Sequence, residues 1–201
     1  MKLIIVSGPS GSGKTTLSKK ILKKLKDGII LNTDNYYRTG ILSQILSKII
    51  PSYFDRKISF NSKKYKRQLE FILKNRFTSF SYKYNFKTRS INKKLKNTKN
   101  INFVIVEGIF GKEILNFYPK NNCIFINLKT DKEKCEKRVI KRDFKERAKS
   151  KTLAKEDFRK AWKLFYKNKK KDKTINYLKK FNVRNKSDIK FLLKKLIKIM
   201  N

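Results

Sequence analysis

Short apolar runs alternate with segments of helical period along this chain. Residues 3–6 are all apolar, as in a strand that is covered on both faces of a parallel sheet. Apolar residues then recur at helical spacing: Leu17, Ile21, Leu22 and Leu25. Asp27 and Gly28 end that helix before a second apolar run at residues 29–31. The order strand, helix, strand predicts a β-α-β unit.

The second half of the chain continues this alternation. Residues 101–106 and 123–128 are mostly apolar stretches of strand length, and we expect buried strands there. Residues 131–146 then place apolar side chains at helical spacing: Cys135, Val139 and Ile140. Residues 149–173 predict a lid segment and a helix whose aromatic residues share one face: Phe158, Trp162 and Phe165.

The remaining segments complete the predicted topology. Residues 174–178 are expected to form the last strand, and residues 185–200 a terminal helix with an apolar stripe. Between residues 40 and 90 the pattern is mixed, with a helix near residues 63–74. Alternating aromatic residues after it indicate a small strand or hairpin: Phe80, Tyr82, Tyr84 and Phe86. The whole pattern predicts a three-layer α/β/α sandwich on a mostly parallel sheet.

The composition excludes several classes of protein and of catalytic site. The 201 residues are enough for one domain with a sizeable core. Histidine is absent, which excludes Ser-His-Asp and Cys-His chemistry and most zinc sites. No apolar run approaches the roughly 18 residues that cross a bilayer, and residues 2–6 are too short for a signal peptide. We therefore expect a cytoplasmic protein without membrane contact, and free buried thiols at Cys123 and Cys135.

The charge of the chain is strongly positive. It has 54 basic against 15 acidic residues, a net charge of +39, which by itself suggests a nucleic-acid partner. Lysine makes up 44 of the basic residues and arginine ten, whereas phosphate and base recognition favours the arginine fork. Lys, Asn and Ile are abundant, as an AT-rich genome encodes by default. We therefore do not expect nucleic acid to be the main partner.

A glycine-rich loop between the first strand and helix carries the clearest chemistry. It satisfies the pattern Gly, four residues, Gly-Lys-Thr, in the context that a phosphate-binding P-loop requires. The expected nucleotide-binding residues are Gly8, Ser10, Gly11, Ser12, Gly13, Lys14, Thr15 and Thr16. Lys14 would reach the β- and γ-phosphates, and Thr15 would supply a hydroxyl to Mg²⁺. The motif predicts a P-loop NTPase that uses ATP, or another nucleoside triphosphate, with Mg²⁺.

Two carboxylates follow buried strands at the edge where the loop lies. Asp34 comes three residues after the second apolar run, and Glu107 directly follows the run that ends at Val106. Ligands of open α/β sheets bind at the carboxyl ends of the strands. A turn or helix-cap role for Asp34 is the structural alternative, since Asn32, Thr33 and Asn35 also favour turns.

With these motifs in order, the chain resembles the uridine-cytidine kinases over about residues 1–150. The resemblance rests on the P-loop, on residues 34–38, 84–86 and 106–109, and on the basic segment of residues 138–147. It implies a single P-loop kinase domain over residues 1–201, with a substrate-binding insertion at about residues 35–95 and a helical lid at about residues 138–155.

The resemblance also implies roles for individual residues. Asp34 would be the catalytic base and a magnesium-linked acid, and Glu107 would help to order the metal. Tyr37 and Tyr84 would contact the nucleoside, although both could instead be core aromatics. Asp55 would bind the ribose hydroxyls.

Three arginines complete the expected site. Arg89 stands where the family has a base-contacting histidine. On the lid, Arg142 and Arg147 would close over the transferring group as catalytic residues. The alternative for the lid arginines is a solvated helix face, with Arg142 and Glu146 as an ordinary pair one turn apart.

We therefore expect ATP-dependent phosphorylation of the 5′-hydroxyl of a pyrimidine nucleoside, uridine or cytidine. One alternative is a P-loop kinase for another small alcohol, such as nicotinamide riboside, pantothenate or ribulose phosphate. The other is an ATP-dependent nucleic-acid-binding module, for which the basic last third of the chain is the argument. The sequence does not decide whether the protein forms a homo-oligomer.

Overall fold

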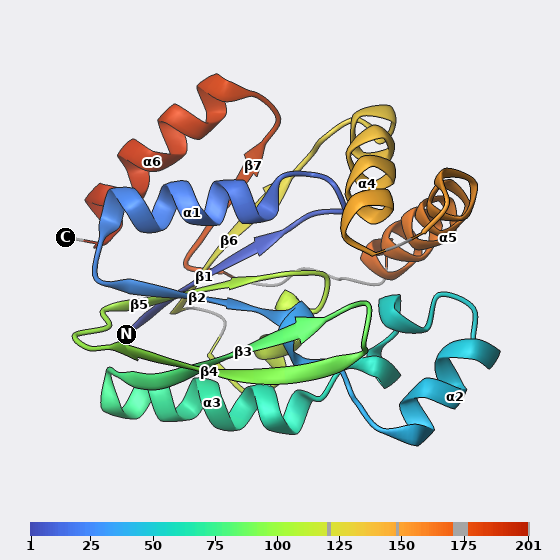
Figure 1. Cartoon of the computed structure of the whole chain (residues 1–201). Helices are drawn as coiled ribbons and strands as arrows, with labels where there is room; N and C mark the ends of the chain where they lie inside the picture. The colour runs from blue at the N-terminus through green and yellow to red at the C-terminus, as the bar shows by residue number, and fades with distance from the viewer. Residues whose placement is uncertain (120–121, 148, 171–176, 201) are drawn as a thin grey trace.

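A computed structural model describes residues 1–119, 122–147, 149–170 and 177–200 (Figure 1). Its centre is a five-stranded sheet in the order β2-β5-β1-β6-β7, in which every neighbouring pair is parallel. The strands are β1 (Lys2–Ser7), β2 (Gly28–Asn32), β5 (Phe103–Glu107), β6 (Cys123–Leu128) and β7 (Lys179–Val183). The predicted α/β fold with a mostly parallel sheet is confirmed.

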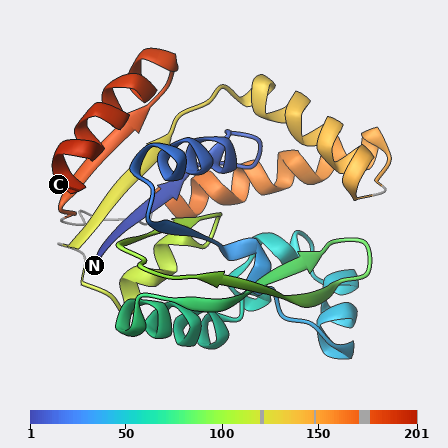
Figure 2. The same cartoon turned by 60° about the vertical axis from the view of Figure 1, so that its left-hand side comes forward.

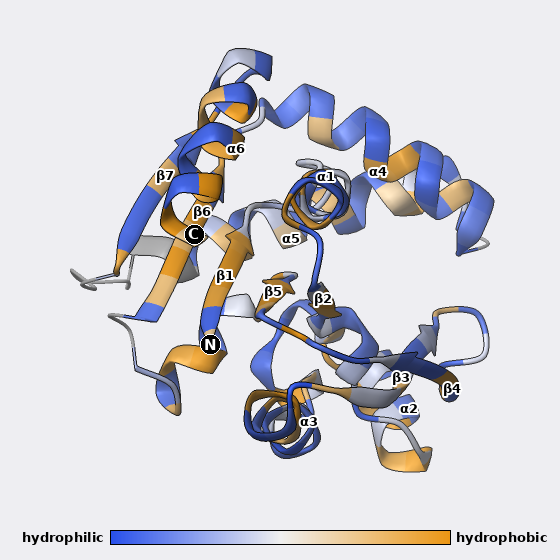
Figure 3. Cartoon of the chain, turned by 90° about the vertical axis from the view of Figure 1, so that its left-hand side faces the viewer, coloured by the Kyte–Doolittle hydropathy of each residue, from blue (hydrophilic) through white to orange (hydrophobic). Residues whose placement is uncertain are grey.

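The central strands are buried on both faces, because successive side chains of a strand point to opposite sides of the sheet. On β1, Leu3 and Ile5 pack into one hydrophobic cluster, and Ile4 and Val6 pack into the other. β5 and β6 divide their side chains between the two clusters in the same way. Figure 3 shows these strands as the apolar centre of a chain whose helices carry polar outer faces.

Two helices cover one face of the sheet. α1 (Lys14–Leu25) and α6 (Lys186–Met200) lie side by side on this face in both views (Figures 1 and 2). Leu17 and Ile21 of α1 and Leu192 and Leu196 of α6 are fully buried against the sheet. The apolar stripe predicted for the terminal helix therefore packs where an α/β sandwich requires it.

The other face is covered by the long segment between β2 and β5. This segment contains the short 3-10 helices η1 (Thr33–Tyr36), η2 (Tyr53–Asp55) and η3 (Lys57–Ser59), the helices α2 (Ile41–Ile49) and α3 (Ser62–Asn75), and an antiparallel hairpin of β3 (Thr78–Asn85) and β4 (Ser90–Thr98). α3 and the hairpin lie together below the sheet (Figures 1 and 2). A further 3-10 helix, η4 (Gly111–Asn116), follows β5 on this face.

The segment predicted as a lid forms two helices that pack on each other, α4 (Lys132–Glu146) and α5 (Lys151–Lys170). The last strand is β7, at Lys179–Val183. The prediction of this strand at residues 174–178 was therefore wrong for residues 177 and 178, which precede β7. Residues 174–176 of that prediction lie outside the described residues. Register with β6 decides the position, because Lys179 pairs with Ile124 and Val183 with Leu128.

Two further features bear on the sequence predictions. Both cysteines are buried and free, as expected. Within the four described ranges, the chain has no helix with the length and apolarity needed to cross a membrane. The cytoplasmic location stays a prediction.

Candidate functional site

The P-loop curls between β1 and α1 so that its backbone encloses the Lys14 ammonium. Gly11 and Gly13 adopt positive φ values of 78° and 94°, which residues with a Cβ rarely take. At Gly11 a Cβ would also lie 2.5 Å from the carbonyl oxygen of Cys135. Lys14 Nζ donates to the carbonyl oxygens of Gly8 and Pro9, both at 3.0 Å. The loop is therefore a compact cradle, of the kind that binds phosphates through backbone N–H groups and one lysine.

Glu107 ends β5 directly beside this cradle. The register places it next to Val6 of β1 on one side and Asn32 of β2 on the other. Its Oε1 accepts hydrogen bonds from Thr15 Oγ1 at 3.1 Å and from Asn32 Nδ2 at 2.9 Å. Burial raises the pKa of the Glu107 carboxyl, and the hydrogen bond from Thr15 acts in the opposite direction. Three strands thus bring this acid to the helix that begins at Lys14.

Asp34 lies at the carboxyl end of β2, in η1. Its backbone N–H donates to Asn32 Oδ1 at 2.8 Å, so Asn32 caps this turn and also contacts Glu107. Burial lowers the pKa of the Lys14 ammonium, while the charges of Asp34 and Glu107 act to raise it. Asn32 provides the cap of this turn, so the side chain of Asp34 is not needed for it. The charge of Asp34 instead acts on the Lys14 ammonium.

The oxygen atoms of Asp34, Glu107 and Thr15 fit a divalent cation. Asp34 Oδ1 and Glu107 Oε2 are buried, and no hydrogen bond from any described residue reaches either atom. Buried carboxylate oxygens without partners are costly unless a ligand satisfies them. Together with the Thr15 hydroxyl they form an all-oxygen donor set, which is the chemistry that Mg²⁺ prefers.

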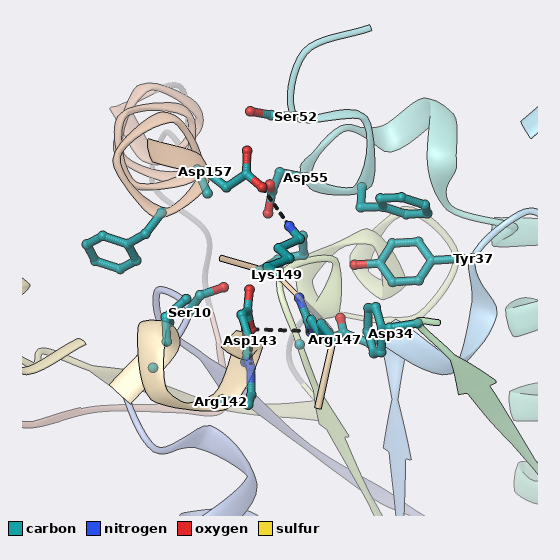
Figure 4. Close-up of a pocket in the computed structure, with 18 of the residues that line it drawn as sticks. Ser10, Asp34, Tyr37, Ser52, Asp55, Arg142, Asp143, Arg147, Lys149 and Asp157 are labelled. Carbon is teal, nitrogen blue, oxygen red and sulfur yellow. Dashed lines mark hydrogen bonds and ion pairs between the residues drawn. The ribbon is translucent and has the colours of Figure 1, made fainter. Parts of the chain in front are cut away.

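A cleft of about 770 Å³ runs from the cradle to the hairpin and the α4–α5 pair (Figure 4). Most of the predicted site residues line it: Ser10, Gly11, Gly13, Lys14, Thr15, Thr16, Asp34, Tyr37, Asp55, Arg89, Glu107, Arg142 and Arg147. Gly8, Ser12 and Tyr84 are not among its lining residues. The fold therefore brings together residues from six separate parts of the sequence.

The end of the cleft away from the cradle combines aromatic rings with charged groups. Tyr37 is buried, and its ring packs edge-on against Phe54 at 5.2 Å and Tyr84 at 5.1 Å. Burial, and after it the charge of Asp34, raises the pKa of Asp55 from 3.8 to about 6. Arg89 Nη1 donates to Ser47 Oγ at 2.6 Å, with the guanidinium 5.9 Å from the Phe54 ring. This end suits an acceptor with a flat part and hydroxyl groups.

Tyr84 lies behind this wall. Its side chain is 4% exposed, and its backbone N–H donates a hydrogen bond to Asn35 Oδ1 at 3.1 Å. Burial raises the pKa of its hydroxyl to about 12. The placement favours the alternative that Tyr84 is a core aromatic supporting Tyr37, rather than a residue that contacts the substrate.

The lid arginines share one buried carboxylate. Arg142 donates to Asp143 Oδ1 through Nε at 2.7 Å, and Arg147 Nε lies 3.5 Å from the same oxygen. The guanidinium of Arg147 also stacks 3.7 Å from the ring centre of Phe86 at the hairpin end. Both arginines line the cleft, and the partner of Arg142 is Asp143 rather than Glu146. A solvated helix face does not describe them.

Sequence reasoning missed several residues of the cleft. Asn32 links the two carboxylates, although in the sequence it is only one of several turn-formers. Lys149 and Asp157 form an ion pair of 2.6 Å that lines the cleft across the turn between α4 and α5 (Figure 4). Their spacing of eight residues across a helix break carries no sequence signal.

Comparisons with known proteins agree with this geometry. The sequence model of the Phosphoribulokinase / Uridine kinase family matches residues 3–169. A relative named uridine kinase from Borrelia duttonii (strain Ly) is 31% identical over 111 residues, 54% of this chain and 52% of the relative. The match thus spans about half the length of that relative. A uridine kinase from Ureaplasma parvum is 27% identical over 153 residues, 74% of this chain and 72% of the relative.

Among solved structures, the D-glycerate 3-kinase from Cryptococcus neoformans is similar with a TM-score of 0.62 at 13% identity. The similarity covers 94% of this chain and 86% of that protein. At this identity the likeness concerns the fold alone, and it agrees with the α/β architecture described above.

Proposed function

The chain belongs to the phosphoribulokinase/uridine kinase family, and on this basis we propose that it transfers the γ-phosphoryl group of ATP to the 5′-hydroxyl of a pyrimidine nucleoside. The names of the uridine kinases that it resembles support the nucleoside class. The observation that carries the proposal is the placement of Asp34. Its buried, unpartnered Oδ1 lies in the cleft that also holds the phosphate cradle and the aromatic acceptor end.

Phosphoryl transfer depends mainly on alignment and on neutralising charge. Lys14 and the backbone of the cradle hold the β- and γ-phosphates, and Asp34 orients the acceptor hydroxyl and receives its proton. Arg142 and Arg147 add positive charge from the α4 side of the cleft. When bound, Mg²⁺ would be held by Thr15, Asp34 and Glu107 and would neutralise phosphate charge.

The acceptor end supports a nucleoside. Tyr37, Phe54 and Phe86 supply aromatic surface for a flat base, and Asp55 supplies a carboxylate for vicinal ribose hydroxyls. Arg89 lies between this surface and Ser47, where it can donate to the carbonyl oxygens of a pyrimidine. We propose that both uridine and cytidine bind at this end of the cleft, because each base has a carbonyl oxygen that can accept a hydrogen bond from Arg89.

One observation favours a second candidate, a small alcohol that already bears a phosphate or carboxylate. Within the described ranges no carboxylate forms an ion pair with Arg89, so its charge is available to an anionic acceptor. Ribulose 5-phosphate and pantothenate are representatives of this class. A neutral nucleoside leaves that charge uncompensated.

A coupled assay of ADP release tests the proposal. Uridine, cytidine, nicotinamide riboside, pantothenate and ribulose 5-phosphate are compared, with Asp34→Asn as the inactive control. We expect turnover with uridine and cytidine, and a 5′-monophosphate as the product in the ³¹P NMR spectrum. Turnover with an anionic alcohol alone would replace the proposal by the second candidate. Turnover with none of these alcohols would refute both.

A further inference from the structure

A second chamber, of about 340 Å³, lies against the outer side of the P-loop. It is enclosed by the carboxyl ends of β1 and β6, by η4 and by α5. Pro9 and Ser10 form its wall toward the cradle, and Asp55 and Phe158 are shared with the main cleft. Its volume is in the range of small-molecule sites, which begins at roughly 300 Å³. Apart from Asp55 and the P-loop, the proposed phosphoryl transfer uses none of the residues that line it.

Two buried polar side chains stand side by side in this chamber. Ser7 of β1 pairs in register with Asn127 of β6, and only 5% and 4% of these residues are exposed. Both occupy the strand face that otherwise carries apolar residues: Leu3, Ile5, Cys123 and Phe125. Polar residues at buried positions require hydrogen-bond partners. Their presence here breaks an apolar pattern at the sheet edge where ligands of α/β folds bind.

The hydrogen bonds of this pair are incomplete. Asn127 Nδ2 donates to Asn182 Oδ1 at 3.1 Å, which orients the amide and leaves its Oδ1 as an acceptor. In the described part of the chain, no hydrogen bond reaches Asn127 Oδ1 or the Ser7 hydroxyl. A ligand that donates to Asn127 Oδ1, and that exchanges a hydrogen bond with Ser7, would satisfy both.

The rest of the wall combines aromatic rings with two cationic and two anionic side chains, those of Lys57, Lys112, Asp55 and Glu113. Phe110, which directly precedes η4, and Trp162 and Phe165 of α5 line the chamber. At its rim Lys57 and Glu113 form an ion pair of 2.9 Å. Aromatic walls favour a flat ring, and equal numbers of cationic and anionic side chains give no net charge that would favour an ionic ligand.

We propose that this chamber binds a neutral heteroaromatic ring carrying an exocyclic amino group, as in adenine or cytosine. The ring packs among Phe110, Trp162 and Phe165, and its amino group donates to Asn127 Oδ1. Because Pro9 and Ser10 form one wall, the bound ring touches the loop that holds the phosphates.

Binding in this chamber can be followed by the intrinsic fluorescence of Trp162. This residue is the single tryptophan of the chain, and it lines the chamber but not the main cleft. Titration with adenine should change the Trp162 fluorescence in a saturable way. Hypoxanthine, which has a carbonyl group in place of the amine, should bind about tenfold more weakly, the value of one hydrogen bond to a buried amide.

Two variants test whether adenine binds in this chamber rather than in the main cleft. Asn127→Leu removes the acceptor, and Phe165→Ala removes part of the aromatic wall at a half-buried helix position. Each should weaken adenine binding about tenfold, whereas Asn92→Leu on the exposed strand β4 should not. An unsaturable signal, equal affinities for adenine and hypoxanthine, or a signal unchanged in Phe165→Ala would overturn the proposal.

Discussion

The Nε atom of Arg147 lies 3.5 Å from Asp143 Oδ1, the same oxygen to which Arg142 Nε donates at 2.7 Å. Asp143 itself is 3% exposed, whereas both arginines line the cleft. A buried carboxylate that holds two guanidinium groups fixes their distance and direction, because charge-assisted hydrogen bonds are short and directional. Asp143 is therefore a positioning residue for Arg142 and Arg147.

Asp143→Asn should lower kcat while the protein stays folded. The amide keeps the size of the side chain but loses the charge that orders Arg142 and Arg147, a loss of about 1.5–3 kcal/mol for bonds to charged groups. That corresponds to a decrease of roughly tenfold to a hundredfold in kcat. Steady-state kinetics of ADP release measures it. Glu146→Gln, an exposed carboxylate on the same helix, is the matched control and should retain its rate. Equal rates in the two variants would remove the positioning role.

Lys14→Ala should leave the fold intact and abolish most of the turnover. The cradle loses the ammonium that lies between its carbonyl oxygens and that would stabilise charge on the phosphates. By comparison with the loss of a preorganised donor, the cost is on the order of 3 kcal/mol, or about a hundredfold in rate. Lys20→Ala, on the exposed face of α1, serves as the control. Activity of the Lys14 variant within tenfold of the unmodified chain would contradict the cradle assignment.

Asp55 should make acceptor binding depend on pH. Its pKa is raised to about 6, so the carboxylate that accepts from the ribose hydroxyls is complete only above this value. The KM for the nucleoside should therefore fall as the pH rises through about 6 and stay constant above it. Asp55→Asn should raise the KM and flatten its pH profile, and Asp27→Asn should do neither. A profile unchanged by Asp55→Asn would show that another group titrates.

The same pKa shift affects stability in the opposite sense. Between pH of about 4 and 6 the folded chain keeps a proton on Asp55 that the unfolded chain has released. The free energy of unfolding should therefore fall as the pH rises through this window, by on the order of 2 kcal/mol for a partly exposed side chain. Urea unfolding at several pH values measures this slope, which Asp55→Asn should remove. A slope that persists in this variant would assign it to other groups.

Arg89 should set the selectivity between pyrimidines. A guanidinium only donates hydrogen bonds, and uracil and cytosine both offer acceptors, so the unmodified chain should discriminate weakly between uridine and cytidine. Arg89→His should increase the ratio of the two kcat/KM values, because imidazole can donate and accept. Arg67→His, at an exposed position of α3, is the control. The same ratio in all three proteins would mean that Arg89 does not contact the base.

The net charge of +39 should have little effect on turnover. Binding that neutralises six to ten phosphates weakens roughly 10³- to 10⁵-fold between about 50 and 200 mM salt. A cradle of backbone N–H groups and one lysine is far less sensitive. Nucleoside phosphorylation should persist at about 200 mM salt while any retention of RNA or DNA fades. Sequence-selective nucleic-acid binding at that salt, without phosphorylation of any alcohol, would favour the binding-module alternative.

The sequence by itself determined the features that are encoded locally. The P-loop motif contains the glycines that its backbone conformation needs, and the neighbouring apolar runs specify β1 and α1 through their own periodicity. The burial of β5 and β6 likewise follows from mostly apolar runs, in which Glu107 and Asn127 are the polar residues. Asp34 and Glu107 could be placed at one edge because parallel strands end together.

Only the tertiary structure decided which distant groups meet. Thr15 reaches Glu107 across 92 positions of sequence because β5 pairs with β1 and β2, an order that no local pattern records. The hairpin buries Tyr84 behind Tyr37, and the turn between α4 and α5 brings Lys149 to Asp157. Ser7 and Asn127 become neighbours through the register of β1 and β6. Register and packing are non-local, since they depend on which surfaces the whole chain can bury together.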